Sequence, residues 1–380
     1  MTSTFIYPPE LEKYHYPDGH PMKPGRAKLA LELCRKNHFF KDEAKEVITS
    51  GRATFEEMAA FHDKDYLNAI KDTARLKEFD PGIMKYGLGT GDCPIFKGLY
   101  DCCTVVAGST LAGTRLLIDK RADIVFAPGG GFHHAFRDHA EGFCYVNDCV
   151  LGIKDLLANG FKRVAYIDLD AHHGNGVQDA FYKDNNVLTI SIHETGRSLY
   201  PGSGFEDEIG EGTGKGFNVN LPMLAGTDDD AWLFTINEII PPLIQAFKPD
   251  AILTQLGGDA LAGDPLTHLR LTNHGYTSAL KTLKTAMVPW IIVGGGGYNV
   301  EATTRMWALA WAVMNGTEPV DYYSGSVGGV FQGSAEIAGS GLYDMHVYTT
   351  GPEKEKIWEN CRNVVRTVKE SVFPIYNIRL

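Results

Sequence analysis

RVAYIDLDAHHGNG, at residues 163–176, is the stretch that decides the fold of this chain. Its apolar first half is typical of a strand that is buried on both faces of a parallel sheet. Asp168, Asp170 and His172 follow in its second half. On an extended strand this spacing points all three side chains to one face, where two carboxylates and an imidazole favour a bound cation. The stretch therefore predicts a buried strand whose end carries part of a metal site.

Four other short apolar runs predict further parallel strands, and the segments between the runs carry helical patterns. The predicted strands, with the first one included, are 122–127, 163–169, 187–192, 250–256 and 288–293. The predicted helices are 102–119, 148–159, 229–246, 274–286 and 301–315. Strands that alternate with helices indicate an α/β fold, with a central parallel sheet and helices on both of its faces.

Polar residues follow several of these strands and are expected to converge. His133 and His134 follow the first strand in the chain, Asp259 the fourth, and Tyr298 the fifth. The carboxyl ends of parallel strands form one edge of a sheet, and α/β proteins bind their ligands there. We therefore expect these side chains to line one crevice together with those of residues 168–172.

Within this crevice, Asp170, His172 and Asp259 are the candidate metal ligands. Three protein ligands with one position left for water are what a catalytic zinc ion prefers. The alternative is a strand end whose carboxylates accept hydrogen bonds from loop amides without any metal.

The His133-His134 pair and Tyr298 are candidates for acid–base chemistry beside that metal. Each follows a run of glycines, which lets the backbone approach a substrate closely. A histidine there can act as general base and acid, and a phenol can donate a hydrogen bond to a developing oxyanion. The alternatives are histidines on the surface or in a hydrogen-bonded core, and a tyrosine that only packs.

Composition excludes several classes of protein. The chain has 380 residues, of which 44% are hydrophobic and 22% charged, so it should bury a sizeable core. A net charge of −11 argues against a nucleic-acid binder and against a binder of anionic membranes, both of which need a basic face. We find no composition shift or linker, and expect one domain over 1–380 in which 316–380 pack on the rest.

The seven cysteines are an odd number without CxxC pairs, which indicates reduced thiols rather than a thiolate zinc site. The amino-terminus lacks a signal-sequence pattern, and no run of about 18 apolar residues occurs. We therefore expect a cytoplasmic protein.

Other chemistries lack their motifs. The GGGG at 294–297 is not followed by the Lys-Ser/Thr of a phosphate-binding loop, and there is no GxGxxG with a later acidic residue. No GxSxG or evident cysteine nucleophile occurs, so a covalent acyl-enzyme is not indicated.

Six motifs identify a family. They are HPMKPGR at 20–26, GGGFHHAF at 129–136, GFCYVND at 142–148, DLDAHHGNG at 168–176, GGDALAGDPL at 257–266 and GGGGY at 294–298. In this order, over about residues 6–315, they resemble the zinc-dependent histone deacetylase superfamily. SIHETGRSLYPGSG at 191–204 and DPLTHL at 264–269 resemble most its bacterial acetoin-utilisation branch. The resemblance implies an arginase/deacetylase fold and zinc-dependent removal of acyl groups from lysine side chains.

The resemblance also implies residue roles. Asp170, His172 and Asp259 would hold zinc, or ferrous iron in the cell. His134 would be the general base and then the acid, with His133 as its electrostatic partner.

The remaining roles that the resemblance implies concern support and substrate. Tyr298 would polarise the substrate carbonyl, Asp168 would hold His133, and Asn175, an aspartate in many relatives, would hold His134. The residues that match the family's acyl-lysine tunnel are Gly142, Phe143, Tyr200 and Leu266. Asp92 matches the tunnel rim, and Arg26 matches a position near the internal acetate pocket. The family also binds monovalent cations (K⁺ or Na⁺) at two sites, which here correspond to Asp168, Asp170, His172 and Ser191 at the first and to Phe181 and Val187 near the second.

Three alternatives to a protein lysine deacetylase stay open. A binuclear manganese ureohydrolase would need a further carboxylate where this chain has Gly174. An acetylpolyamine amidohydrolase would differ in substrate alone, although no long acidic insertion favours a polyamine. A protein that binds acylated ligands without turnover would not need the full set of ligands, histidines and tyrosine. The expected partner is an acylated lysine of a protein or peptide, and the oligomeric state is open.

Overall fold

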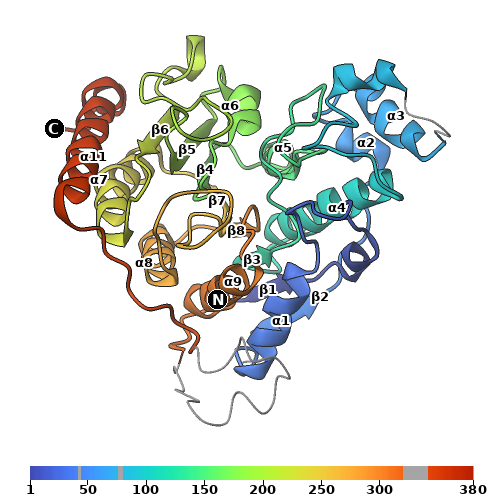
Figure 1. The fold of residues 1–380 in the computed structure, drawn as a ribbon, viewed down its shortest axis with the longest axis horizontal. Helices are drawn as coiled ribbons and strands as arrows, with labels where there is room; N and C mark the ends of the chain where they lie inside the picture. The colour runs from blue at the N-terminus through green and yellow to red at the C-terminus, as the bar shows by residue number, and fades with distance from the viewer. Residues whose placement is uncertain (42–43, 76–79, 320–340, 380) are drawn as a thin grey trace.

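The computed structural model describes residues 1–41, 44–75, 80–319 and 341–379. Its centre is an eight-stranded sheet with the strand order β2-β1-β3-β8-β7-β4-β5-β6, in which every pair of neighbours is parallel (Figure 1). The strands are β1 Ser3–Ile6, β2 Lys45–Ile48, β3 Ile124–Ala127, β4 Val164–Asp168, β5 Val187–Glu194, β6 Asn218–Met223, β7 Ala251–Gln255 and β8 Trp290–Val293.

Helices cover both faces of the sheet, because the central strands are apolar on both sides. On one face pack α2 Phe55–Met58, α3 Lys64–Asp72, α4 Leu99–Ile118, α5 Asp148–Ala158 and α6 Asn175–Phe181. On the other face pack α1 Arg26–Lys36, α7 Asp229–Phe247, α8 Asn273–Lys284, α9 Val300–Met314 and α11 Gly351–Val372. Of the tail expected to pack on the rest, residues 320–340 and 380 lie outside the described residues, and α11 packs on α7 and β6.

The α/β architecture with a parallel sheet is confirmed, and all five predicted strands are present within three residues at each end. Three strands escaped prediction. β1 (STFI) and β6 (NVNLPM) mix polar with apolar residues, and β2 (KEVI) is a partly exposed edge strand. None of the three is a continuous apolar run, so their strand structure depends on neighbours in the sheet rather than on their own pattern.

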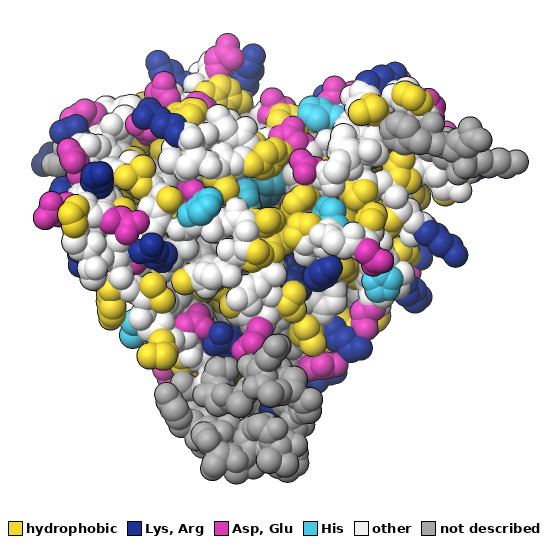
Figure 2. Space-filling model, in the orientation of Figure 1, with side chains coloured by type: hydrophobic (Ala, Val, Ile, Leu, Met, Phe, Trp, Pro, Cys, Tyr) yellow, Lys and Arg dark blue, Asp and Glu magenta, His cyan; other side chains and the backbone are white. Residues whose placement is uncertain are grey.

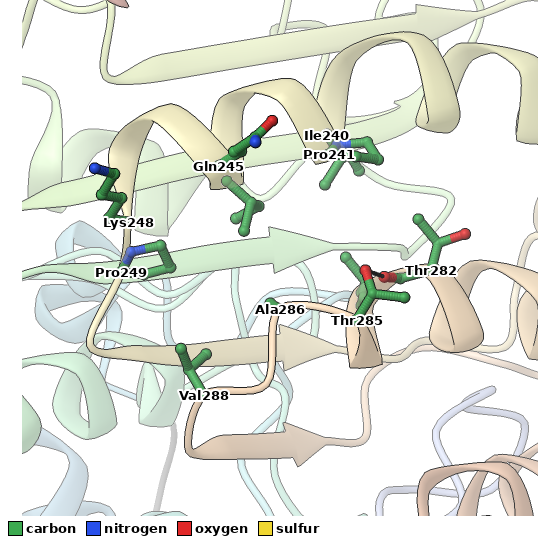
Figure 3. A pocket seen from close by; sticks show the side chains of 11 residues that line it. Ile240, Pro241, Gln245, Lys248, Pro249, Thr282, Thr285, Ala286 and Val288 are labelled. Carbon is green, nitrogen blue, oxygen red and sulfur yellow. Dashed lines mark hydrogen bonds between the residues drawn. The ribbon is translucent and has the colours of Figure 1, made fainter.

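The two edges of the sheet differ in chemistry. A groove of about 470 Å³ lies at the amino-terminal edge, between the ends of α7 and α8 (Figure 3). Lys248 is the only titratable residue among its lining residues, so this groove offers no acid–base pair or metal-ligand set. The polar residues after β3, β4, β7 and β8 gather at the opposite, carboxyl-terminal edge. Figure 2 shows histidine side chains in a hollow that hydrophobic side chains flank.

Two further observations bear on the expectations from composition. All seven cysteines are buried and free of disulfides. None of the described helices is both long enough and hydrophobic enough to cross a membrane.

Candidate metal centre and active site

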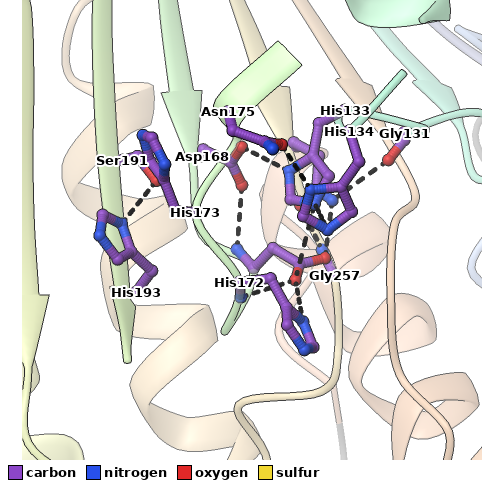
Figure 4. Close-up of polar contacts among 12 residues, drawn as sticks. Gly131, His133, His134, Asp168, His172, His173, Asn175, Ser191, His193 and Gly257 are labelled. Carbon is purple, nitrogen blue, oxygen red and sulfur yellow. Dashed lines mark hydrogen bonds and ion pairs between the residues drawn. The ribbon is translucent and has the colours of Figure 1, made fainter. Parts of the chain in front are cut away.

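Three buried side chains form a candidate metal centre. One ligand atom from each of Asp170, His172 and Asp259 lies within 4.8 Å of the others. His172 Nδ1 is 2.9 Å from Asp259 Oδ2 and 3.2 Å from Asp170 Oδ1. β4 ends at Asp168, so Asp170 and His172 lie in the loop after the strand and not on one face of an extended strand as expected. This loop brings His172 to both Asp170 and Asp259, which follows β7, the neighbour of β4. Figure 4 shows His172 below the histidine pair.

Backbone amides and one side-chain amide orient the two carboxylates. Asp170 Oδ2 accepts hydrogen bonds from Gln255 Nε2 at 2.7 Å and from the amide of Gly296 at 2.9 Å. Asp259 Oδ1 accepts one from the amide of Ala171 at 2.8 Å. A Cβ on Gly296 would overlap Asp259 Oδ2, so only glycine lets the backbone come this close to the carboxylates.

The electrostatics of this group favour a positive charge among the three side chains. Burial would lower the pKa of His172, but Asp259 and Asp170 outweigh burial and raise it to about 10. Burial and the neighbouring Asp170 raise the pKa of Asp259 to about 7. Two carboxylates and one imidazole, with one face toward the histidine pair, fit the oxygen and nitrogen donors that zinc binds in catalytic sites. A Cβ at Gly174 would overlap Asp168 Oδ2, so the loop has no room for the further carboxylate of a binuclear centre.

The two adjacent histidines differ in their partners. His133 Nδ1 donates a hydrogen bond to Asp168 Oδ2 at 2.7 Å, and that oxygen also accepts one from Tyr166 at 2.6 Å. His134 Nδ1 donates to Asn175 Oδ1 at 2.8 Å. The Nε2 atoms of the two rings face each other at 3.1 Å, so one must donate while the other accepts.

Their pKa values move in opposite directions. Burial would lower the pKa of His133, but Asp168 and Asp170 outweigh it and raise the pKa to about 9. Burial, assisted by the positive charges of His133 and His172, holds the pKa of His134 well below its usual range. His133 therefore carries the charge and donates its Nε2–H, while His134 stays neutral and accepts with its Nε2 lone pair. The hydrogen bond to Asn175 acts in the opposite direction and raises the pKa of His134, but burial and the neighbouring cations outweigh it.

Asn147 and Asp148, which the sequence reasoning did not single out, hold the histidine loop. The buried Asp148 carboxylate accepts hydrogen bonds from the amides of Gly131 (2.9 Å) and Phe132 (2.8 Å). Asn147 Nδ2 donates to the carbonyls of His133 (3.1 Å) and Ala135 (2.9 Å). Both belong to GFCYVND, but the side-chain contacts across the loop come from tertiary structure, which the motif alone does not reveal.

Tyr298 ends the glycine loop after β8 and is half-buried near the histidines. Its amide donates to Asp264 Oδ2 at 2.7 Å, and burial raises the pKa of its phenol well above the usual range. The loop is fixed from behind by Arg26, whose guanidinium donates to the carbonyls of Gly295, Gly296 and Gly297 at 2.7–2.8 Å. Arg26 also lines a small buried hollow with Tyr16, Met22 and Trp307, among others.

Two of the expected tunnel residues, Gly142 and Tyr200, lie against His134, and a third, Phe143, lies against Tyr298. The Tyr200 ring lies 5.2 Å from the His134 ring, and the Phe143 ring lies 5.8 Å from the Tyr298 ring. A Cβ on Gly142 would lie 2.5 Å from the His134 ring. Asp92 is exposed, and its carbonyl accepts a hydrogen bond at 3.3 Å from His20, which packs on Phe143. Leu266 is half-buried and lies two residues after Asp264. The Asp264 carboxylate accepts hydrogen bonds from the backbone amides of Leu266 and Tyr298.

The residues expected near monovalent cations divide into two groups. Ser191 lies beside Asp168 in the pairing of β5 with β4, close to the candidate metal ligands. Its hydroxyl contacts His193 Nδ1 at 2.8 Å. Phe181 and Val187 are buried at the end of α6 and the start of β5, away from that edge.

Comparisons with known proteins agree on one family. The histone deacetylase domain matches residues 20–314. Histone deacetylase 6 of Arabidopsis thaliana is 36% identical over 320 residues, which cover 83% of this chain and 67% of the relative. The acetoin utilization protein AcuC of Bacillus subtilis is 38% identical over 323 residues, which cover 83% of each chain. The crystal structure of a histone deacetylase homologue from Aquifex aeolicus matches with a TM-score of 0.85 and 31% identity, over 97% of this chain and 100% of that one. Against several eukaryotic relatives this chain spans about two thirds of their length.

Proposed function

This chain belongs to the histone deacetylase family, and on that premise we propose that it hydrolyses the acyl amide of lysine side chains in proteins, releasing acetate from acetyl-lysine. Members of the family are hydrolases of acetyl-lysine amide bonds. The observation that carries the proposal is the buried Asp170, His172 and Asp259 group beside a histidine pair of which one member is held neutral.

Asp170, His172 and Asp259 are the proposed zinc ligands. When bound, zinc acidifies a water molecule and polarises a carbonyl group, which is the chemistry that amide hydrolysis needs at neutral pH. The same three ligands also suit ferrous iron. We further propose that a K⁺ or Na⁺ ion near Asp168 and Ser191 supports the ligand loop.

His134 is the proposed general base. Because its Nδ1–H is donated to Asn175, its Nε2 carries a lone pair, which accepts from His133 in the structure and can take a proton when the attacking water replaces that contact. The proton is then available for the leaving lysine amine, which cannot depart as an anion. His133, charged and held by Asp168, supplies a positive charge beside the negative charge that develops during attack.

Tyr298 is the proposed donor to the developing oxyanion. Since burial raises the pKa of its phenol, the hydroxyl keeps its proton at neutral pH. Gly142, Phe143, Tyr200 and Leu266 would enclose the acyl-lysine stem, with Asp92 at the rim and Arg26 at the inner hollow.

The test is turnover of an acetyl-lysine peptide by the zinc-loaded protein, with acetate measured as product. His134→Ala and Tyr298→Phe should abolish or strongly reduce turnover while zinc content stays the same. An inactive wild-type protein that contains one zinc per chain would refute the proposal in favour of a protein that only binds acylated ligands.

Two substrate questions follow from this function. Likeness to AcuC leads us to propose acetylated enzymes of acetate or acetoin metabolism as substrates. Comparing lysine acetylation between wild-type and deletion strains would test this. Acetylated polyamines are the second candidate class, and a higher kcat/KM for them than for acetyl-lysine peptides would replace protein lysine as the substrate.

A further inference from the structure

Glu141 connects two parts of the site, although none of the roles proposed above involves it. Its Oε1 accepts hydrogen bonds from Asn175 Nδ2 at 2.8 Å and from the Tyr200 hydroxyl at 2.6 Å. Its Oε2 lies 3.5 Å from His139 Nε2. One half-buried carboxylate thus contacts both the residue behind His134 and a wall of the proposed tunnel.

The contact with Asn175 fixes which way the amide points. A carboxylate can only accept hydrogen bonds, so Glu141 selects the orientation with Nδ2 toward itself and Oδ1 toward His134. The amide of Gly176 also donates to this oxygen, at 3.0 Å. With an oxygen facing it, His134 Nδ1 must donate, and Nε2 is left without a proton. A flipped amide would present its NH₂ group to Nδ1 and favour the tautomer that cannot act as a base at Nε2.

The backbone holds Glu141 in place. Residues 141–144 form a tight turn in which the amide and carbonyl of Glu141 pair with those of Cys144 at 2.8–3.0 Å. Gly142 and Phe143 have positive φ of 52° and 67° at its centre. The turn is therefore well defined, and Glu141 projects from its first position onto Asn175 and Tyr200.

We propose that Glu141 is a positioning residue for the general base: it sets the orientation of the Asn175 amide, and through it the tautomer of His134. By the same carboxylate it tethers Tyr200, so the tunnel wall and the base are aligned together. The inference rests on the proposed role of His134.

The first test compares Glu141→Leu, which removes the acceptor, with Glu141→Gln, which keeps an acceptor oxygen. Glu141→Leu should lower kcat by about tenfold or more, a fraction of what a general base contributes. Glu141→Gln should stay within about threefold of wild type, since a carbonyl oxygen can also accept two hydrogen bonds. Asp138→Leu is the matched control, because it removes an exposed carboxylate that contacts only His139 among the described residues. Equal losses in Glu141→Leu and Asp138→Leu would show an effect of surface charge and overturn the proposal.

The second test repeats Glu141→Leu in an Asn175→Asp background. A carboxylate at position 175 has two equivalent oxygens and no wrong orientation, and it would lie beside the like charge of Glu141. Glu141→Leu should therefore lower kcat when position 175 is asparagine and raise it when position 175 is aspartate. The same loss in both backgrounds would mean that Glu141 only stabilises the turn, and would refute the mechanism.

A third measurement does not depend on turnover. ¹⁵N spectra of histidine-labelled, zinc-loaded protein report the tautomer of His134, and Glu141→Leu should increase the form protonated at Nε2. An unchanged tautomer would contradict the inference. An inactive wild-type enzyme with the expected tautomer shift would instead contradict the proposed function alone.

Discussion

Gly142→Ala should disable the general base while leaving the metal ligands in place. The added Cβ would lie 2.5, 2.7 and 3.0 Å from three atoms of His134. Carbon atoms in contact are normally about 3.5–4.0 Å apart, so the ring or the turn must move by about 1 Å. A displacement of that size at a reacting group costs about 10²-fold in rate. We therefore expect kcat to fall about a hundredfold, with unchanged zinc content because Asp170, His172 and Asp259 lie on other loops.

A matched control separates the clash from backbone strain. Gly142 has a φ of 52°, so alanine there is strained even without a clash, by about 1–2 kcal/mol. Gly212 has a φ of 58° and nothing within 4 Å of its would-be Cβ. Gly212→Ala should thus lose similar stability in thermal unfolding but keep its kcat. Equal kcat values for the two variants on an acetyl-lysine peptide, at equal zinc occupancy, would refute the steric argument.

Four further outcomes are expected. Elemental analysis should find about one zinc-type ion per chain, and two tightly bound manganese ions would instead support a ureohydrolase. Tyr298→Phe should lower kcat by about 10²-fold or more with fold and zinc intact, so wild-type turnover would remove the phenol from the mechanism. Asn175→Asp adds a carboxylate beside His134, whose pKa is held low, and the negative charge should raise that pKa. The acidic limb of the kcat/KM profile should therefore move to higher pH by up to about one unit. An acidic limb that stays in place or moves to lower pH would contradict this. Burial lowers the pKa of His62 from 6.5 to about 4, so the folded protein holds this side chain neutral while the unfolded chain protonates it at a higher pH. The stabilisation from the neutral His62 is therefore complete above pH 6.5 and is lost as the pH falls toward 4. That loss is about 3 kcal/mol at most. The free energy of unfolding of His62→Gln should fall less than that of the wild type over this pH range. Parallel curves of unfolding free energy against pH for the two proteins would exclude this contribution of His62.

The apolar runs predicted the middle of the sheet, because strands buried on both faces have little freedom in composition. β3, β4, β5, β7 and β8 are of this kind. The edge strand β2, with the sequence KEVI, has a composition that a loop could share. Its pairing with β1 is a property of the assembled sheet, and no local pattern encodes it.

The candidate site could be predicted as a set of residues but not as a geometry. Strand ends and motifs indicated Asp170, His172 and Asp259, whereas the orientation of the Asp170 carboxylate depends on hydrogen bonds from Gln255 and Gly296, which are distant in sequence. Glu141 had no recognisable signal, because its importance depends on where the turn places it.

The place of β7 in the sheet has a consequence for how the chain folds as it is synthesised. β7 lies between β4 and β8, although β5 and β6 come before it in the chain. His172 and Asp259 are therefore neighbours in space but 87 residues apart in sequence. Contacts between such distant residues form slowly, and amino-terminal parts of a nascent chain become structured first. A ribosome-bound chain that has exposed the DLDAHHGNG segment holds only part of the ligand set. If the three candidate ligands bind the metal together, binding requires that β7 is in place, so metal supplied during synthesis should protect only chains translated beyond Asp259 from proteolysis.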